Sequence, residues 1–296
     1  MTKCLRRIVR CACLPLMLCA SSAQTADILV EDALGRAVSL REPASRVVAL
    51  APHIVENLYS IGAGELLVGA VAYSDYPAQA AELPRVGGVG SFSLERILAL
   101  SPDLVIAWDS GTSAKLKAAL QRLGLTLYVD EVHSLSALAQ SLENLGALTG
   151  HRDSGWEAAQ RLRTRSSPAH STGDPTHRVP LLLQVWDRPL QSIGGNHLLT
   201  EVINSCGGRS ISENISGLAP VISIESVLAA DPQLIIVESE DQGAHWSAYP
   251  GLRAVANGNI FVMDPDTLYR PTLRLIQGMQ TLCGRLDAIR NPQPRR

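Results

Sequence analysis

Short apolar runs alternate with amphipathic stretches along the first half of the chain. The apolar runs predict buried strands at 46–50, 67–71, 104–107 and 125–129. Helical periodicity predicts helices at 52–60, 94–100 and 114–123. Period-two alternation over 28–40 predicts a hairpin in addition. Buried strands that alternate with helices are typical of parallel α/β sheets.

The second half of the chain shows the same alternation. Its apolar runs predict strands at 179–186, 189–193 and 260–263. A helix is predicted from a cap at Asn196 to Cys206, with Gly207 and Gly208 ending it. A final helix is predicted over 273–289. These elements indicate a second α/β lobe.

Two segments 130 positions apart repeat one another. Residues 93–108 are SLERILALSPDLVIAW, and residues 223–238 are SIESVLAADPQLIIVE. Seven of the sixteen positions are identical without a gap, and most of the others exchange apolar types. The repeat predicts two lobes of similar fold. The alternative, two copies of a generic helix–proline–strand unit, also gives two α/β lobes.

The segment between the halves is predicted to be helical. Leucines at spacings of three and four give residues 135–148 an apolar helix face, with an end near Thr149, and Gly150 interrupts the pattern. Residues 154–165 are strong helix formers, and we expect a long helix of about 20 residues, or about 30 Å, to cross between the lobes. The expected organisation is a lobe over 24–149, a linking helix over 150–170 and a lobe over 171–296.

The first residues differ from the rest of the chain. Residues 1–10 are basic, residues 11–20 are apolar, and Ser21-Ser22-Ala23 are small, which predicts a secretory signal peptide over 1–23 and a periplasmic location. The alternatives are a membrane anchor, for which the apolar run is only half long enough, and a lipoprotein modified at Cys19. Without the leader the net charge is about −6, and no basic patch appears, which argues against a nucleic-acid partner.

Only two cysteines, Cys206 and Cys283, lie outside the predicted leader. An isolated pair in an exported protein predicts one disulfide, and the alternative is two free buried thiols. Both residues fall on predicted helices of the second lobe.

Candidate chemistry points to binding rather than catalysis. No catalytic motif is present, so we expect neither an enzyme nor a cofactor, and no two histidines have metal-ligand spacing. His53 follows a strand end, where open α/β sheets bind ligands, although a structural role at a helix start is the alternative. Aromatic residues form only 4% of the chain, yet Tyr73, Trp186 and Tyr269 all follow strands or lie in loops. Such rings favour a large flat ligand held between lobes, and the alternative is that each ring has an ordinary packing role.

Several of these segments carry a family resemblance that covers essentially the whole mature chain. They are RVVALAPHIVENLYSIGAGELLVGAVAYSDYP (46–77), residues 93–108, QVWDRPLQSIGG (184–195), CGG (206–208) and residues 223–238. Together they resemble the periplasmic cobalamin-binding proteins that feed vitamin B12 ABC importers. The resemblance implies the class III periplasmic binding protein fold, a monomer, cobalamin as transported ligand, and an inner-membrane permease with its ATPase as partners.

The resemblance also implies roles for particular residues. It matches Tyr73 to a ligand contact, and it matches one loop of the second lobe to further contacts: Asp266, Thr267, Leu268, Tyr269 and Arg270. Glu95 and Glu225 match the acids that dock on the permease, where the alternative is two acids that favour a helix start. Cys206 and Cys283 align with the family's disulfide.

Other functions remain open at this point. A relative of the same class would bind haem or a ferric siderophore, which requires a His or Tyr iron ligand or a basic site; Arg270 and Arg274 are the obvious basic pair. The segment AYSDYP, residues 72–77, favours cobalamin over these. From other classes, an exported cobalamin-handling enzyme would turn its ligand over, and a purely structural interaction module would bind no small molecule.

Overall fold

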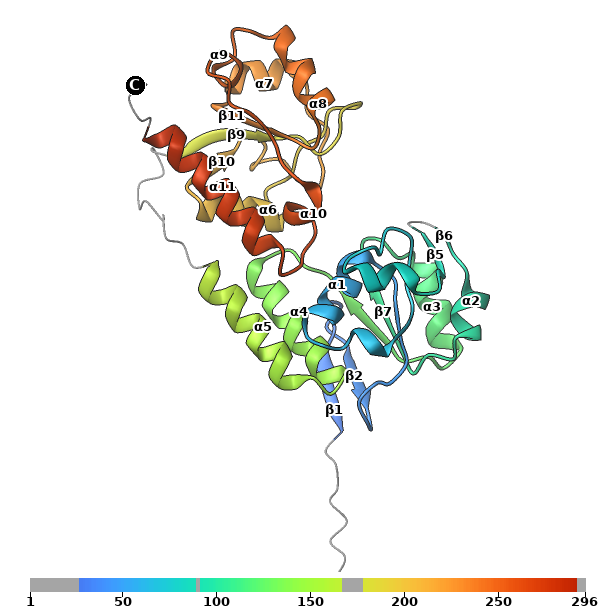
Figure 1. Ribbon diagram of the computed structural model, residues 1–296. Helices are drawn as coiled ribbons and strands as arrows, with labels where there is room; N and C mark the ends of the chain where they lie inside the picture. The colour runs from blue at the N-terminus through green and yellow to red at the C-terminus, as the bar shows by residue number, and fades with distance from the viewer. Residues whose placement is uncertain (1–26, 89–90, 167–177, 292–296) are drawn as a thin grey trace, which may run out of the picture.

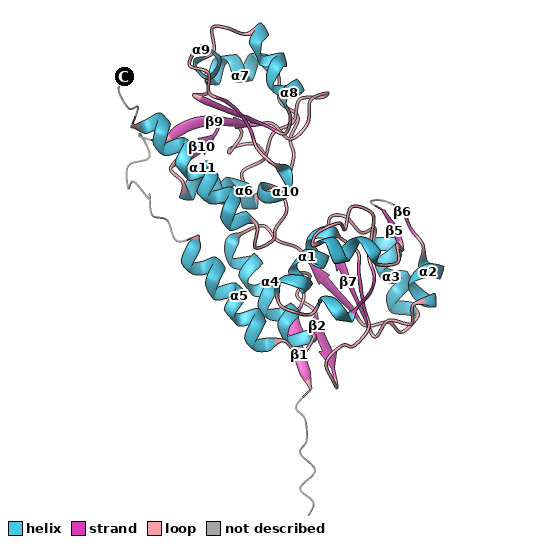
Figure 2. Cartoon of the chain, viewed as in Figure 1, coloured by secondary structure: helices cyan, strands magenta, loops and turns pink. Residues whose placement is uncertain are grey.

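The computed structural model describes residues 27–88, 91–166 and 178–291, so the predicted leader lies outside the described residues. The chain forms two α/β lobes that are separated on one side and joined on the other, next to a pair of helices (Figure 1). Each lobe contains a parallel sheet with helices packed on it (Figure 2). Within the described ranges, no helix has the length and apolar character needed to cross a bilayer.

The first lobe is built on a four-stranded parallel sheet. Its order is β4 (Leu67–Gly69), β3 (Val47–Ala49), β7 (Leu104–Trp108) and β8 (Leu127–Asp130). The helices that connect these strands are α1 (Pro52–Ser60), α2 (Leu94–Ala99) and α3 (Ala114–Arg122), with short 3-10 turns at Gly64–Leu66 and Ala78–Glu82. Two antiparallel pairs complete the lobe: β1 (Ile28–Glu31) with β2 (Ala37–Leu40), and β5 (Gly87–Gly88) with β6 (Ser91–Phe92). The predicted hairpin, strands and helices of this half are confirmed to within a few residues.

The second lobe has the same sheet topology. Its parallel strands lie in the order β10 (Gly208–Ser210), β9 (Val179–Leu183), β11 (Leu234–Val237) and β12 (Ile260–Val262). Its helices are α6 (Leu198–Ser205), α7 (Ile224–Ala230), α8 (Glu240–His245), α9 (Arg253–Ala256), α10 (Pro265–Leu268) and α11 (Leu275–Arg290), with a 3-10 turn at Trp246–Ala248. In both four-stranded sheets, the strand that comes first in the sequence of that sheet lies between the second and the third.

The sequence repeat corresponds to a structural repeat. Ser93 and Ser223 each cap the helix that follows, because each hydroxyl accepts a bond from the backbone N–H three residues on. Ile97 and Val227, at equivalent positions of α2 and α7, are fully buried. The strand after each helix, β7 or β11, then lies at the centre of its own sheet. The prediction of two similar lobes is therefore confirmed.

Two predictions for the second lobe are wrong. Residues 189–193 do not form a strand, since Gln191 makes only isolated bridges, to Trp186 and to Val221. The cap of α6 is His197 instead of Asn196: its Nδ1 accepts from the backbone N–H of Leu199 at 3.0 Å. The neutral nitrogen of an imidazole can accept this bond. Histidine is nevertheless not among the residues preferred at helix starts, so the prediction chose the asparagine.

The helix predicted over 135–148 is confirmed, and a second helix follows it along the chain. α4 (Leu135–Leu148) and α5 (Arg152–Arg165) pack side by side as a helical hairpin (Figure 1). A Cβ atom built on Gly146 would lie 3.0 Å from the Cα of Gly155, so only glycines allow this close approach. The described helix α5 has 14 residues, which is about 21 Å, and the last residues of the linking helix predicted over 150–170 lie outside the described residues.

The predicted disulfide is present. Cys206, at the end of α6, is bonded to Cys283 of α11, with Cα atoms 4.7 Å apart. Cys206 is fully buried among the apolar residues that both helices present to the sheet. The bond therefore fastens two helices of the second lobe to one another.

Candidate functional site

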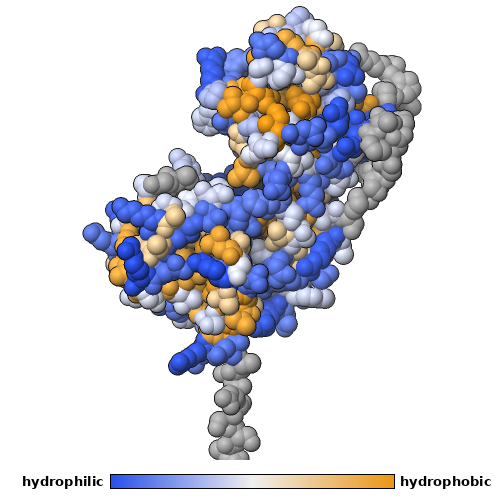
Figure 3. Space-filling model, turned by 180° about the vertical axis from the view of Figure 1, so that it is seen from behind, coloured by the Kyte–Doolittle hydropathy of each residue, from blue (hydrophilic) through white to orange (hydrophobic). Residues whose placement is uncertain are grey.

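The site begins where the strands of each sheet end. Because all strands of a parallel sheet point the same way, the residues that follow them gather along one edge. In the first lobe that edge carries His53 and Trp108, and in the second it carries Trp186 and Glu238. The molecule is deeply hollowed between the two lobes (Figure 3).

The first-lobe edge contains a pair of rings, of which His53 is buried and Trp108 half-buried. His53, in the first turn of α1, is 7% exposed, and its ring meets that of Trp108 edge-on at 5.5 Å between centroids. The indole N–H of Trp108 donates to Glu131 Oε1 at 3.1 Å. Burial, together with the positive charge of Arg270, lowers the pKa of His53 to about 3. The imidazole is therefore neutral at physiological pH.

Tyr73 has an exposed ring and a strained backbone, and neither feature stabilises the fold. Its side chain is 74% exposed, and its backbone lies in the left-handed region at φ +64°. For a bulky residue that conformation costs about 1–3 kcal/mol, and such strain clusters at binding sites. An exposed ring on a strained backbone, just after a strand of the sheet, has the character of a ligand contact rather than of a packing residue.

The second-lobe edge carries one exposed indole, and the lobe contains a buried polar network. Trp186 is 58% exposed, and its N–H donates to the Arg188 carbonyl at 3.2 Å. In the same lobe, the buried indole of Trp246 donates to Gln184 Oε1 at 2.8 Å. Burial raises the pKa of Tyr269, and the charge of Glu238 adds to that rise. The phenol of Tyr269 is thus held neutral and partly buried.

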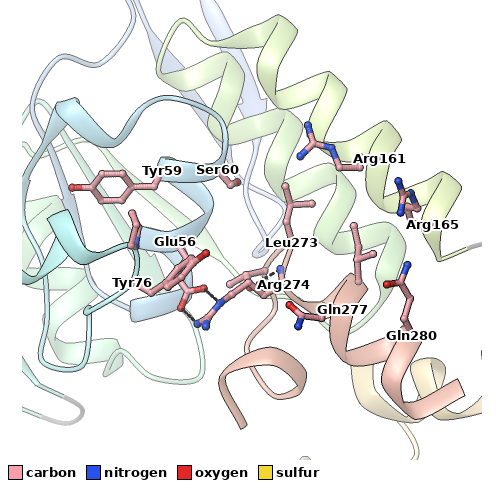
Figure 4. Close-up of a pocket in the computed structure, with 13 residues that line it drawn as sticks. Glu56, Tyr59, Ser60, Tyr76, Arg161, Arg165, Leu273, Arg274, Gln277 and Gln280 are labelled. Carbon is pink, nitrogen blue, oxygen red and sulfur yellow. Dashed lines mark hydrogen bonds and ion pairs between the residues drawn. The ribbon is translucent and has the colours of Figure 1, made fainter. Parts of the chain in front are cut away.

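The two lobes are tied together by an ion cluster made of Glu56, Arg270 and Arg274, here called the interlobe ion cluster. Figure 4 shows the pairing of Glu56 with Arg274. Glu56 comes from α1 of the first lobe and is 4% exposed. Its carboxylate accepts from Arg270 at 2.6 Å and from Arg274 at 2.9 and 2.8 Å. Both arginines come from the second lobe, in the segment between α10 and α11.

Further contacts reinforce the same junction. Arg270 also pairs with Asp266 at 2.9 Å and approaches Asp75 of the first lobe at 3.6 Å. The Asn57 side-chain amide donates to the Pro271 carbonyl at 3.0 Å. Arg274 lies over the ring of Tyr76, 4.0 Å from its centroid. Both guanidiniums are therefore already matched by carboxylates of the protein.

Of the five loop residues predicted to contact ligand, some lie at the site and others do not. Asp266, Tyr269 and Arg270 lie at the second-lobe edge and the junction, as described above. Thr267 donates its hydroxyl to the Asp264 carbonyl at 2.9 Å. Leu268 is 1% exposed and packs in the core, because residues 265–268 form a short helix, α10, where a loop was expected. Its side chain is thus turned away from the hollow, and we remove it from the candidate contacts.

Sequence reasoning missed two members of the site. Trp108 ends a buried strand, and the rule that selected the other aromatic residues at strand ends would have found it. Glu56 carried no such signal, because its role depends on two arginines more than 200 positions away.

The acids matched to permease docking occupy equivalent places. Glu95 and Glu225 are exposed and lie in the first turns of α2 and α7. A backbone N–H and the hydroxyl of Ser223 lower the pKa of Glu225. Each lobe thus presents one carboxylate at the same point of the repeated unit. No cluster of three or more metal-ligating side chains occurs in the described part of the chain.

The fold and the paired edges define a class of protein, and comparison with known proteins agrees. The family model described as periplasmic binding protein matches residues 47–267. The chain belongs to this family.

Individual relatives narrow the class. The chain is 34% identical, over 81% of its length and 88% of the relative's, to a vitamin B12-binding protein of Vibrio cholerae. The crystal structure of the periplasmic vitamin B12 binding protein BtuF of Vibrio cholerae superposes with a TM-score of 0.77 at 33% identity, covering 84% of this chain and 99% of that one. A periplasmic heme binding protein from Pseudomonas aeruginosa superposes with a TM-score of 0.69 at 25% identity, covering 82% and 92%.

Proposed function

We propose that this protein captures cobalamin in the periplasm and delivers it to an inner-membrane ABC importer. The observation that carries the proposal is the pair of sheet edges, one on each of two like lobes, that carry the exposed rings of Tyr73 and Trp186, together with the hollow between the lobes (Figure 3). A large flat ligand bound there would cover both rings, and the two lobes would bury most of the ligand's surface. The relatives named as vitamin B12-binding proteins support the choice of ligand.

The charges at the junction argue against an anionic siderophore. Recognition of such a ligand needs free cations, and Arg270 and Arg274 are held by the buried carboxylate of Glu56. Haem is the remaining competitor within the class. Its iron would need an accessible phenol or imidazole; Tyr73 and Tyr76 are exposed, whereas His53 and Tyr269 are largely buried.

The proposal extends to how the protein acts. The leader over residues 1–23 would export the chain, and the protein would work as a monomer that binds cobalamin without changing it chemically. Glu95 and Glu225, one on each lobe, would meet the permease while the hollow holds the ligand. Release would follow ATP hydrolysis in the importer.

Calorimetric titration of the chain from residue 24 with cyanocobalamin, haem and a ferric siderophore tests the ligand. We expect saturable one-to-one binding of cyanocobalamin and recovery of the ligand unchanged. The proposal would be refuted if haem or the siderophore bound and cyanocobalamin gave no binding signal. Conversion of the bound vitamin to a new product would refute it too.

A matched pair of tryptophan variants tests the place of binding. Trp186→Ala removes a ring that is 58% exposed at the second-lobe edge, and Trp156→Ala removes one that is 57% exposed on α5. If the ligand covers about 100 Å² of the Trp186 ring, the loss is about 2.5 kcal/mol, or more than tenfold in Kd. Equal affinities of the two variants would show that the ligand lies elsewhere.

A further inference from the structure

A second cavity lies at the junction of the lobes, behind the interlobe ion cluster. Its volume is about 540 Å³, within the range of small-molecule sites. Its walls come from three places: the end of α1 and the turn at Tyr76, the last turns of α5, and the start of α11 (Figure 4). Each lobe and the helical hairpin thus contribute to one cavity.

The cavity is separate from the proposed ligand site. None of His53, Tyr73, Trp108, Trp186 and Tyr269 lines it. Arg274 stacks on Tyr76 and bonds to Glu56, and these three side chains form the wall that the cavity presents toward the ion cluster (Figure 4). The cavity therefore needs an explanation other than cobalamin.

The cavity carries excess positive charge. Arg161 and Arg165, one turn apart on α5, line it and are exposed. Within the described part of the chain, neither guanidinium has a carboxylate or another hydrogen-bond partner, in contrast to Arg163 of the same helix, which pairs with Glu143 at 2.6 Å. The helix dipole stabilises basic residues near the end of a helix, which explains part of this charge. It does not explain why both side chains line the same cavity.

Neutral hydrogen-bonding groups face the two arginines. Gln277 and Gln280 project from α11 into the space below α5, and Ser60 borders it at the end of α1 (Figure 4). Amides and a hydroxyl beside unpaired guanidiniums form a donor-rich lining. Guanidinium forks match the oxygens of phosphate and carboxylate groups in geometry and charge.

We propose that this cavity binds an oxyanion, a phosphate or carboxylate group, held by Arg161 and Arg165. The group can arrive as a free small anion or as the headgroup of an anionic lipid. Because the walls belong to both lobes, an occupant touches the interlobe junction without entering the hollow. The site does not depend on the identity of the ligand between the lobes.

The test compares two double variants of the whole mature chain. R161Q with R165Q removes the charges that face the cavity, and R152Q with R163Q removes the same charge from exposed positions elsewhere on α5. Inorganic phosphate is titrated in low-salt buffer, where screening is weakest. We expect phosphate to bind about tenfold or more weakly to the first variant and with unchanged affinity to the second.

Vesicles separate the two sources of the anion. Phosphatidylcholine vesicles with and without phosphatidylglycerol are sedimented with each protein. Phosphate binding lost only in R161Q with R165Q supports a free anion, and phosphatidylglycerol-dependent sedimentation with the same loss supports a lipid headgroup. Failure to bind either probe, or equal binding by the two variants, overturns the proposal, and cobalamin binding would be unaffected in that case.

Discussion

Replacing Glu56 by Gln tests whether the interlobe ion cluster holds the lobes together. The change keeps the shape of the side chain but removes the charge shared by Arg270 and Arg274. Removing one partner of a buried ion pair typically costs about 3–5 kcal/mol. Here the arginine side chains keep 20% and 19% of their surface exposed, so water solvates them partly. We therefore expect a loss of about 2–3 kcal/mol.

The assay is urea unfolding, with thermal melting beside it. For a chain of this size the expected loss lowers the Tm by about 3–5 °C. Glu143→Gln is the matched control, because it breaks the exposed Glu143–Arg163 pair and should cost less than about 1 kcal/mol. If Glu56→Gln is as stable as the wild type, or loses no more than Glu143→Gln, the lobes are not held by this cluster.

Three further predictions follow from the same structure. Cys206→Ser with Cys283→Ser opens a loop of 77 residues and should lower the free energy of unfolding by up to about 4 kcal/mol in urea; an unchanged midpoint would contradict a stabilising bond. The pKa of His53 falls to about 3 on folding, so stability should decline as the pH drops from about 6.5 toward 3, and less steeply in His53→Gln; parallel profiles would contradict this. Glu95→Ala with Glu225→Ala should reduce cobalamin uptake by cells with the importer while calorimetry shows an unchanged Kd; normal uptake would rule out docking through these acids.

Local sequence signals determined most of the fold. Apolar runs located the central strands, and the repeat at an offset of 130 gave two lobes with equivalent capped helices. The errors arose where local preference competes with tertiary contacts. Gln191 makes only isolated bridges, so the apolar run around it did not become a strand. Residues 265–268 form a short helix that turns Leu268 into the core, which no periodicity of four residues can indicate.

The site was less predictable than the fold. Strand-end position identified Tyr73 and Trp186 as exposed rings, because parallel strands align their ends whatever the details of packing. The sequence marked Arg270 and Arg274 as a basic pair, but their pairing with Glu56 depends on how the two lobes pack, and Glu56 does not differ locally from other charged residues. The second cavity is built from three separate helices, so its charge is visible only when α1, α5 and α11 are brought together.

The central claim is that two like lobes hold cobalamin between facing sheet edges. A crystal structure of the mature chain with cyanocobalamin tests it most directly. The account predicts the corrin ring in the hollow, in contact with Trp186 from one lobe and Tyr73 from the other. Cyanocobalamin bound on an outer surface, or a hollow filled by the protein's own side chains in crystals that exclude the vitamin, would contradict it.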